Sequence, residues 1–405
     1  MDLYLAYRAL GQTWAFLPFQ VLYLEQRGHS IGDALDLNVV LSLGTVLFEV
    51  PTGLYADRYG RRRAMALGGL IMSVACMLFV AGDSMTWYSI ANVLFALSIT
   101  LSSGADSAYL YDYLAETGRT DRYARLEAVA TAAKAVGNLA AVLVAGVIFA
   151  FAPAGVFVFT GVLTSAASVA SMALPESHHP GRGGSVSEDL VRASQTLWFT
   201  GRLRATVLFG AATFVLLRMS LFTDQPHIEQ HLTTASAPQL AMAAAALQAA
   251  KEIGKVVVAA AAGLLFRTVK IRWLVPALAV ALVGVYAAMS FGIGALDVVL
   301  MVLLSSLFGL FAPLMRALMN RAIPSSRDRA TLLSLDSMAR GLLFAAVSPV
   351  FGRAVESSSL HAAFAGTAWV AAAVYLGLAV YALTTPRLTV VPSDTGGSAI
   401  SSYLS

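Results

Sequence analysis

The sequence predicts an all-α, polytopic membrane protein with twelve transmembrane helices in two pseudo-symmetric halves of six. Three observations support this fold class. Of the 405 residues, 58% are hydrophobic and 12% are charged, whereas soluble domains carry about 25% charged residues. Apolar stretches of about 18 residues or more recur along the whole chain, and each could cross a bilayer as a helix. Basic residues gather in alternate loops, as a fixed membrane orientation requires.

Polar or Gly-containing segments separate the predicted helices. In the first half we expect helices at 3–24, 34–56, 64–82, 86–115, 124–150 and 154–174. In the second half we expect helices at 205–226, 237–266, 273–292, 296–319, 330–354 and 360–384. The first apolar segment runs from Leu3 past Leu22, which is too long for the core of a cleavable signal peptide.

The longest polar stretch divides the chain into domains. We expect an N-terminal six-helix bundle at 1–174, a cytoplasmic linker at 175–204 and a C-terminal six-helix bundle at 205–384. The linker ends in a short amphipathic segment, expected on the membrane surface, whose apolar residues are Leu190, Leu197 and Trp198. Residues 385–405 are rich in Ser and Gly, which predicts a disordered cytoplasmic tail.

The distribution of basic residues predicts the orientation. With the N-terminus in the cytoplasm, only Arg27 and Arg353 fall outside, and the remaining basic residues of the loops fall inside. Both termini are therefore expected in the cytoplasm. This topology explains the net charge of +4 without a nucleic-acid partner. The basic residues are mostly Arg, with only four Lys, which favours a bacterial inner membrane.

Several classes of function lack the residues they need. Cys76 is the single cysteine and lies in an apolar run, which excludes a disulfide framework or a thiolate metal cluster. His227 and His231 stand four apart, but we expect them at an outer loop end and predict no metal site. Phosphate-binding loops and catalytic triads are absent from the sequence, so we expect neither an enzyme nor a cofactor. Transport would then use an ion gradient or be passive.

The two halves show a weak internal repeat. The segment 53-GLYADRYGRRRAMAL-67 resembles 263-GLLFRTVKIRWLVPA-277 in its order of apolar helix, Gly-Leu, basic turn and apolar helix. Likewise 124-ARLEAVATAAKAVG-137 resembles 330-ATLLSLDSMARGLL-343, which matches Lys134 with Arg340. Parallel repeats of this kind place a transporter's site near the membrane midplane between the halves. Chance similarity among Ala/Leu-rich helices is the alternative.

The segment 53-GLYADRYGRR-62 carries the most specific motif. With this motif, the chain resembles the major facilitator superfamily, whose signature reads Gly-x-Leu-Ala-Asp-Arg-x-Gly-Arg-Lys/Arg. The signature departs only at Tyr55, and the other matches are Gly53, Ala56, Asp57, Arg58, Gly60, Arg61 and Arg62. The resemblance covers essentially the whole chain. It implies that family's fold, a small-molecule substrate, protons as a coupling partner and a monomer in the bilayer.

One branch of the family is similar at more positions. Pro18, Tyr23, Leu24 and Gly28 of the first helix, with 48-FEVPTG-53, look like drug/proton antiporters. Two departures weaken this likeness. The antiporter motif of the fifth helix is degraded to 137-GNLAAVLVAG-146, and the Arg that many drug exporters carry in the fourth helix is missing near Thr100.

The resemblance assigns the signature a conformational role. In the family this turn stabilises the outward-open state by holding helices of both halves, with an acid at the end of the fourth helix as partner. Asp112 stands at that position. The expected latch therefore comprises Gly53, Asp57, Arg58, Gly60, Arg61 and Asp112. Alternatively, the arginines only set the topology.

Asp106 and Glu49 are the candidates for proton coupling. Asp106 lies inside the fourth helix, and a carboxylate in a membrane interior can take up and release a proton near neutral pH. A structural ion pair with Lys134 is the alternative. Glu49 precedes the signature by one turn and stands beside Pro51, where a structural hydrogen bond is equally plausible.

The other intramembrane polar residues are expected to face a cavity, because a charge on a lipid-facing surface is costly. In the second half, a Glu252–Lys255 pair would leave Lys251 free, and Asp224 with Gln225 is expected near the outer end. Arg8 is expected to snorkel to the cytoplasmic surface, and Asp336 to pair with Arg340. The predicted cavity residues are Gln12, Tyr109, Lys134, Asn138, Arg218, Asp224, Gln225, Lys251 and Glu252.

The sequence therefore favours a secondary active transporter that works by alternating access. The signature and the first helix favour proton-coupled export of a drug-like compound or metabolite. The alternative is proton-coupled uptake of an anionic or zwitterionic nutrient, because intramembrane cations outnumber the acids. A non-transporting membrane sensor is a remote alternative.

Overall fold

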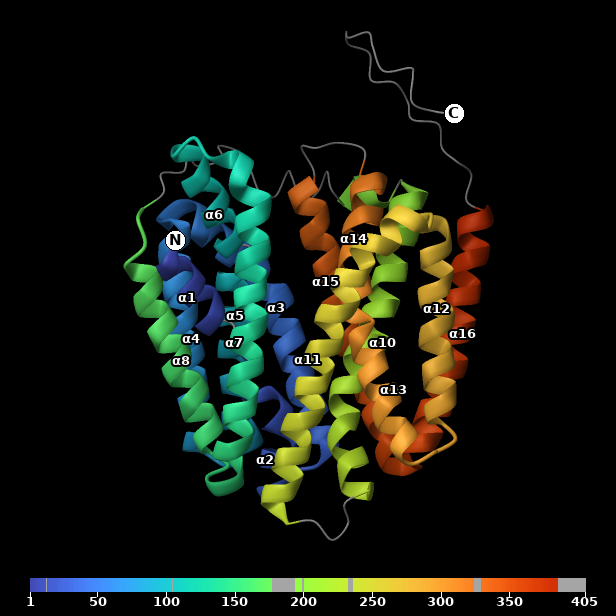
Figure 1. Ribbon diagram of the computed structural model, residues 1–405. Coiled ribbons are helices and arrows are strands. Elements are labelled where there is room, and N and C mark those ends of the chain that lie inside the picture. Colours follow the sequence, from blue (N-terminus) through green and yellow to red (C-terminus); the bar gives the residue numbers. More distant parts are fainter. Residues whose placement is uncertain are drawn as a thin grey trace.

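Long helices make up the protein in the computed structural model, which describes residues 1–11, 13–103, 105–176, 194–198, 200–231, 236–323 and 329–384. Within those ranges every regular element is a helix. The helices run roughly side by side in two groups, α1–α8 and α10–α16 (Figure 1). The all-α fold class is confirmed.

The first group holds the helices up to residue 172. They are α1 (Asp2–Leu10), η1 (Leu17–Phe19), α2 (Gln20–Gln26), α3 (Ile31–Tyr59), α4 (Arg61–Ala81), α5 (Met85–Ser102), α6 (Ala105–Glu116), η2 (Thr120–Arg122), α7 (Tyr123–Phe151) and α8 (Gly155–Met172). The second group holds α10 (Gly201–His231), α11 (Ala237–Thr268), α12 (Ile271–Met289), α13 (Ala295–Ser306), α14 (Phe308–Ala322), α15 (Arg329–Ser357) and α16 (Leu360–Thr384).

Ten segments are long and apolar enough to cross a membrane, two of them formed by α5 with α6 and by α13 with α14. By length and composition the described residues therefore contain ten candidate spans, and not the twelve that were predicted. Two expected spans are missing from the ten. The first predicted helix is interrupted, and α11 carries a stripe of charged residues near its middle.

Three predicted helices are wrong as continuous elements. The segment 3–24 is divided into α1, η1 and α2, and Pro18, which cannot donate a backbone hydrogen bond, stands in the first turn of η1. The segment 86–115 is divided where Ser103 adopts an extended conformation (φ −64°, ψ 117°) at the end of α5. Leu307 separates α13 from α14 in the segment 296–319.

Helix α3 is longer than predicted and includes most of the signature. It begins with a capping box, in which the Ser30 hydroxyl accepts from the Asp33 amide (3.1 Å) and the Asp33 carboxylate accepts from the Ser30 amide (2.8 Å). It ends at Tyr59, because Gly60 adopts φ 96°, a conformation that side-chain-bearing residues rarely adopt. The turn to α4 is therefore a single residue.

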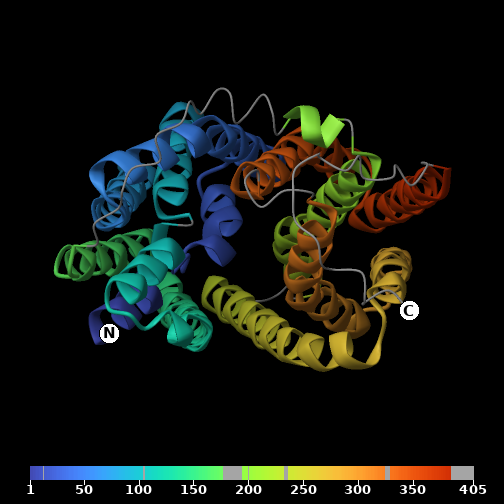
Figure 2. The ribbon, with the colours of Figure 1, turned by 90° about the horizontal axis from the view of Figure 1, so that it is seen from above.

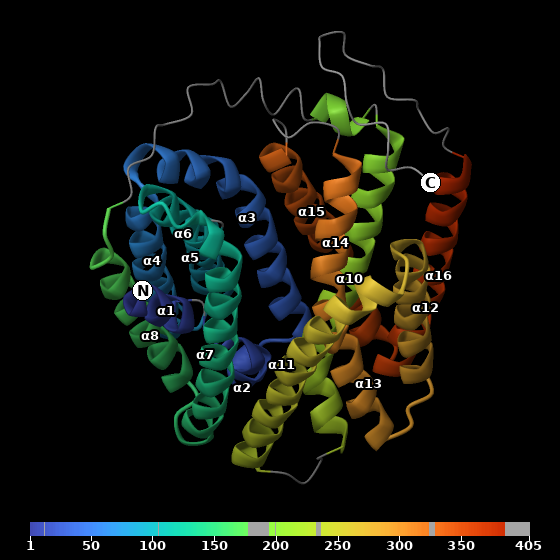
Figure 3. The ribbon, with the colours of Figure 1, turned by 45° about the horizontal axis from the view of Figure 1, so that its top comes forward.

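The two groups touch along two helix pairs, α3 with α15 and α7 with α11, which lie side by side when the molecule is seen from above (Figure 2). We call the end of the bundle that holds Arg58 and Arg61–Arg63 the arginine-rich end; α2 lies at the opposite end. The groups lie closest near α2 and diverge towards the arginine-rich end (Figures 1 and 3).

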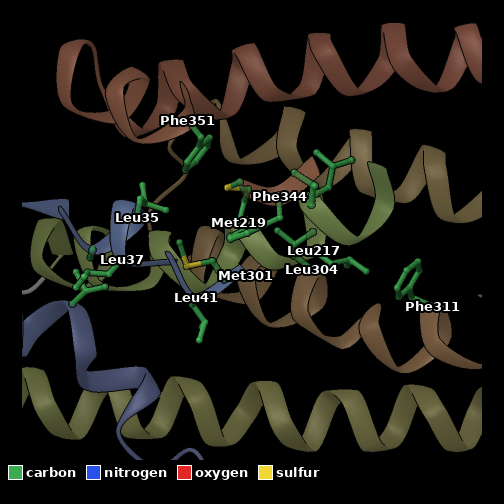
Figure 4. Close-up of a cluster of buried hydrophobic side chains, with 14 of the residues drawn as sticks. Leu35, Leu37, Leu41, Leu217, Met219, Met301, Leu304, Phe311, Phe344 and Phe351 are labelled. Atoms are coloured by element: carbon green, nitrogen blue, oxygen red, sulfur yellow. The ribbon is translucent and has the colours of Figure 1, made fainter. Parts of the chain in front are cut away.

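An apolar core joins the groups at the end near α2. It includes Leu35 and Leu41 of α3 together with Phe344 and Phe351 of α15, and Leu35 lies beside Phe351 (Figure 4). A second core cluster lies at the arginine-rich end, and its described members come from the first group alone. The apolar contact between the groups is thus concentrated towards one end of the molecule.

Small residues allow α7 and α11 to approach closely. A Cβ atom added at Gly146 of α7 would lie 2.5 Å from the Cβ of Ala245 on α11. Ala145 and Ala241 are fully buried in the same core. Side chains of this size let the two backbones pack closely in a membrane.

We expect Gly146→Ala to lower the thermal unfolding temperature of the purified protein in detergent, because overpacking a close contact costs about 1–3 kcal/mol. The matched control is Gly284→Ala on α12, where an added Cβ meets no heavy atom within 4 Å. That control should be neutral or slightly stabilising, since Ala is the better helix former. Equal unfolding temperatures for the two variants would contradict the close α7–α11 contact.

Candidate functional site

A buried ionic network connects three helices of the first group. Arg8 of α1 forms an ion pair with Asp106 of α6, and both residues are 5% exposed. The second terminal nitrogen of Arg8 lies 3.4 Å from a carboxylate oxygen of Glu127 on α7. The expectation that Arg8 snorkels to the surface is wrong, because its guanidinium lies inside the bundle between two carboxylates.

Neutral side chains complete this network. The Ser107 hydroxyl donates to the Glu127 carboxylate (2.7 Å), and the Tyr4 hydroxyl donates to the main-chain carbonyl of Asp106 (3.1 Å). The Ser107 amide donates to the Asp106 carboxylate (2.7 Å). Hydrogen bonds of this kind stabilise ionised groups away from water. Asp106 is therefore part of a network built mainly with Arg8 and Glu127.

Lys134 lies where the two groups meet. It stands on α7, half-buried, within electrostatic reach of Asp106 and Glu127 in its own group and of Glu252 on α11. One turn further along α7, the Asn138 side-chain oxygen accepts from the Trp14 amide (3.3 Å). Asn138 thus satisfies the backbone just before η1, where the first segment is not helical.

The second group has its own ionic pairs. Lys251 of α11 is fully buried and pairs with Asp224 of α10. The expectation that Lys251 is free is therefore wrong, and its pair with Asp224 joins α11 to α10. Glu252 accepts from Lys255 (2.8 Å) and from Gln248 (2.9 Å), as their spacing on one face predicts.

Two arginines of the second group, Arg340 and Arg218, differ in their partners. Arg340 pairs with Asp336 four residues earlier on α15 and also lies over the Phe311 ring (5.3 Å). Arg218 of α10 lies over the rings of Phe214 (5.7 Å) and Phe344 (5.0 Å). No carboxylate of the described residues lies within ion-pair distance of Arg218, and its buried Nε has no hydrogen-bond partner among them.

Glu49 lies at the contact between the groups. It is half-buried on α3, and the Ser334 hydroxyl of α15 donates to its carboxylate across a distance of 3.5 Å. The described part of the chain supplies no cation within ion-pair distance of Glu49. This carboxylate therefore depends on a neutral partner that belongs to the other group.

Comparison with known proteins assigns the family. A family model described as Major Facilitator Superfamily matches residues 8–349. The chain belongs to the major facilitator superfamily. It is therefore a multi-pass membrane transport protein and not an enzyme.

Individual relatives of this superfamily member are distant. The uncharacterized MFS-type transporter YxaM of Bacillus subtilis (strain 168) is 30% identical over 95 residues, or 24% of each chain, so the match spans about a quarter of that relative. A crystal structure of nucleoside transporter NupG has a TM-score of 0.74 at 12% identity, covering 95% of this chain and 98% of that one.

Two further solved structures share the fold. A D-xylose-proton symporter has a TM-score of 0.68 at 15% identity, with 95% of each chain covered. A bacterial homolog of the human lysosomal transporter Spinster, in an inward-facing and occupied conformation, has a TM-score of 0.66 at 16% identity, with 94% of each chain covered.

Among the described residues, the arginines of the superfamily signature contact the first group. Arg61 of α4 pairs with Asp112 of α6, and Arg62 donates to the Leu174 carbonyl (2.8 Å). Asp57 and Arg58 lie exposed in the last turn of α3. At Gly53 an added Cβ would meet no neighbour within 4 Å. In this conformation the arginines of the signature fasten α4 to α6 and to the end of α8.

The remaining predicted residues lie elsewhere. Tyr109 is packed in the core cluster of the first group, and its hydroxyl donates to the Pro175 carbonyl (2.8 Å). His227 is buried in α10, not at a loop end. Gln12 and the side chain of Gln225 lie outside the described residues. Among the described residues, no three His, Cys, Asp or Glu side chains are grouped to hold a metal ion.

Sequence reasoning missed Arg8 and Glu127 as partners of Asp106. A signal for Glu127 was present, because it stands seven residues before Lys134 and therefore on the same face of α7. Arg8 offered no such signal, since its position near the start of an apolar segment is equally typical of a surface arginine.

We expect Lys251→Met to lower the stability of the protein by about 3–5 kcal/mol, because it leaves the Asp224 carboxylate without its cation. Thermal unfolding in detergent would measure the loss. Lys255→Met should have a smaller effect, since Lys255 is partly exposed and its partner Glu252 keeps Gln248 as a donor. Adding Asp224→Leu to Lys251→Met should restore most of the stability, and a double variant as unstable as the single one would refute the pairing.

Proposed function

We propose that this protein is a proton-coupled secondary transporter that exports a drug-like compound or metabolite by alternating access. The observation that carries the proposal is the position of Glu49. It lies between the two groups, which must separate at the end near α2 when access alternates, and Ser334, which donates a hydrogen bond to its carboxylate, belongs to the opposite group. Separation of the groups would therefore change the surroundings of the Glu49 carboxylate and so its binding of a proton.

In this mechanism the helices up to residue 174 and those from 205 to 384 move as two bundles. Apolar contacts of α3 with α15 and of α7 with α11 join them at the end near α2. Opening that end requires these contacts to break while the arginine-rich ends approach. The positive-inside pattern places the arginine-rich end in the cytoplasm, so the described conformation would be inward-facing, with both termini cytoplasmic.

Proton coupling follows from the environment of Glu49. A buried, ionised carboxylate without a cation is costly. We propose that Glu49 binds a proton when α3 packs against α15 and releases it when they separate. Asp106 is the second proposed proton site, because Arg8 is shared between Asp106 and Glu127 and can stay paired with one carboxylate while the other is protonated.

The latch acts in the opposite state. Arg61 and Asp112 join α4 to α6 within the first group. Asp57 and Arg58 lie exposed, and Gly53 has open space beside it. We propose that closing the arginine-rich end brings helices of the second group onto this surface, where Asp57 meets a helix N-terminus.

Uptake of an anionic or zwitterionic nutrient is the second candidate. Arg218 favours it, because it lies near the middle of α10 without a carboxylate partner among the described residues and so suits a negatively charged group. The direction of transport depends on the gradients as well as on the residues. We also propose that the protein is a monomer and lies in a bacterial inner membrane.

Accumulation of a panel of fluorescent compounds in energised, efflux-deficient bacteria tests the proposal. Wild type should lower accumulation, and Glu49→Gln, Asp106→Asn or an uncoupler should each restore it. The matched control is Asp36→Asn, which neutralises an exposed carboxylate of the same helix as Glu49 and should behave as wild type. Equal accumulation with wild type and Glu49→Gln would contradict a coupling role for Glu49.

A flat result across the whole panel would argue against drug export. Proteoliposomes under an imposed pH gradient then test the second candidate. Uptake of a small organic anion that follows the gradient in wild type and fails in Glu49→Gln would establish the proton-coupled importer.

A further inference from the structure

Arg218 is the cation of the described helices whose surroundings are least explained by folding. It stands near the middle of α10, and its guanidinium lies over Phe214 of its own helix and Phe344 of α15. Its Nε is buried and has no hydrogen-bond partner among the described residues. Aromatic rings attract a cation but accept no N–H hydrogen bond of normal strength.

Other basic side chains between the helices have carboxylate partners. Arg8, Lys251 and Arg340 each contact a carboxylate on their own or a neighbouring helix. Arg340 is the closest parallel to Arg218, because it also lies over a phenylalanine ring but has Asp336 as its counter-ion. The described part of the chain provides no such anion for Arg218.

A charged group inside a membrane is expected to serve a function unless it is paired. The guanidinium is planar and offers paired N–H donors that match a carboxylate in a bidentate arrangement. The two rings cover the surroundings of Arg218 with apolar surface. A ligand that reaches the guanidinium therefore meets a cation and aromatic carbon together.

We infer that Arg218 binds the carboxylate of the transported solute, and that the solute is an organic carboxylate with an apolar body that packs against Phe344 or Phe214. This inference rests on the proposed transport function and deepens it by naming the substrate class. It holds for export and for uptake, because a site near the middle of the membrane binds the solute in either direction of transport.

A purely structural role for Arg218 predicts a different response to mutation. A cation that stabilises the fold causes a loss of stability when it is removed, whereas a buried cation without a partner can be replaced by a hydrophobic residue without loss. Arg218→Met should therefore leave the unfolding temperature of the ligand-free protein unchanged or higher. Arg340→Met should lower it, since Asp336 would lose its cation.

The binding test uses thermal unfolding of the purified, full-length protein with benzoate, cinnamate and indole-3-acetate, each at about 10 mM, and with the amide of each acid. At least one carboxylate should raise the unfolding temperature of wild type by about 2–4 °C, and its amide should not. The shift should disappear in Arg218→Met and persist in Arg340→Met, measured from the lower starting temperature of that variant. Phe344→Leu should reduce the shift without abolishing it.

Three results would overturn the inference. The first is a shift of equal size with the amides, and the second is an undiminished shift in Arg218→Met. The third is the absence of a shift with every carboxylate. Because this assay requires no transport, carboxylate binding without accumulation differences would leave the inference standing and count against the proposed function. Proton-driven transport without carboxylate binding would support the proposed function and overturn the inference about Arg218.

Discussion

The cost of placing charge in a membrane governs the arrangement of this protein. An ionised side chain that faces lipid is strongly disfavoured, so charged side chains turn into the bundle, where most of them pair with a counter-ion. Arg8, Asp106 and Glu127 satisfy one another and thereby hold α1, α6 and α7 together. Lys251 and Asp224 do the same for α10 and α11. The helices that fail to qualify as simple apolar spans are also helices that contribute to these pairs.

Glycines complement the ionic pairs by setting how closely helices approach. Gly137 and Gly146 belong to the segment of α7 in which the exporter motif is degraded. A Cβ at Gly137 would lie 2.9 Å from the Ala9 Cα on α1, and one at Gly146 would meet Ala245 on α11. The two glycines therefore retain a packing function on opposite sides of one helix, within its group and between groups.

The fold class could be predicted from the sequence because its signals are local. Apolar length, the spacing of basic loops and the signature around Asp57 can each be recognised without knowledge of tertiary contacts. The interruption at Leu307 could not, since neither Gly nor Pro stands at the break itself. The polar residues of the site could be named, but their partners could not. Arg8 lies 98 residues from Asp106 in sequence, and only packing of α1 against α6 and α7 brings them together.

Helix α3 has a mechanical consequence through its length. It runs without interruption from Ile31 to Tyr59, about 40 Å at 1.5 Å per residue. Leu35 in the apolar contact, Glu49 beside Ser334 and Asp57 of the signature all stand on this one rod. If α3 tilts as one rigid body, separation of its Leu35 end from α15 and approach of its Asp57 end to the second group become the same motion. The stiffness of α3, and not any single contact, would then determine how strictly opening of the end near α2 is coupled to closing of the arginine-rich end.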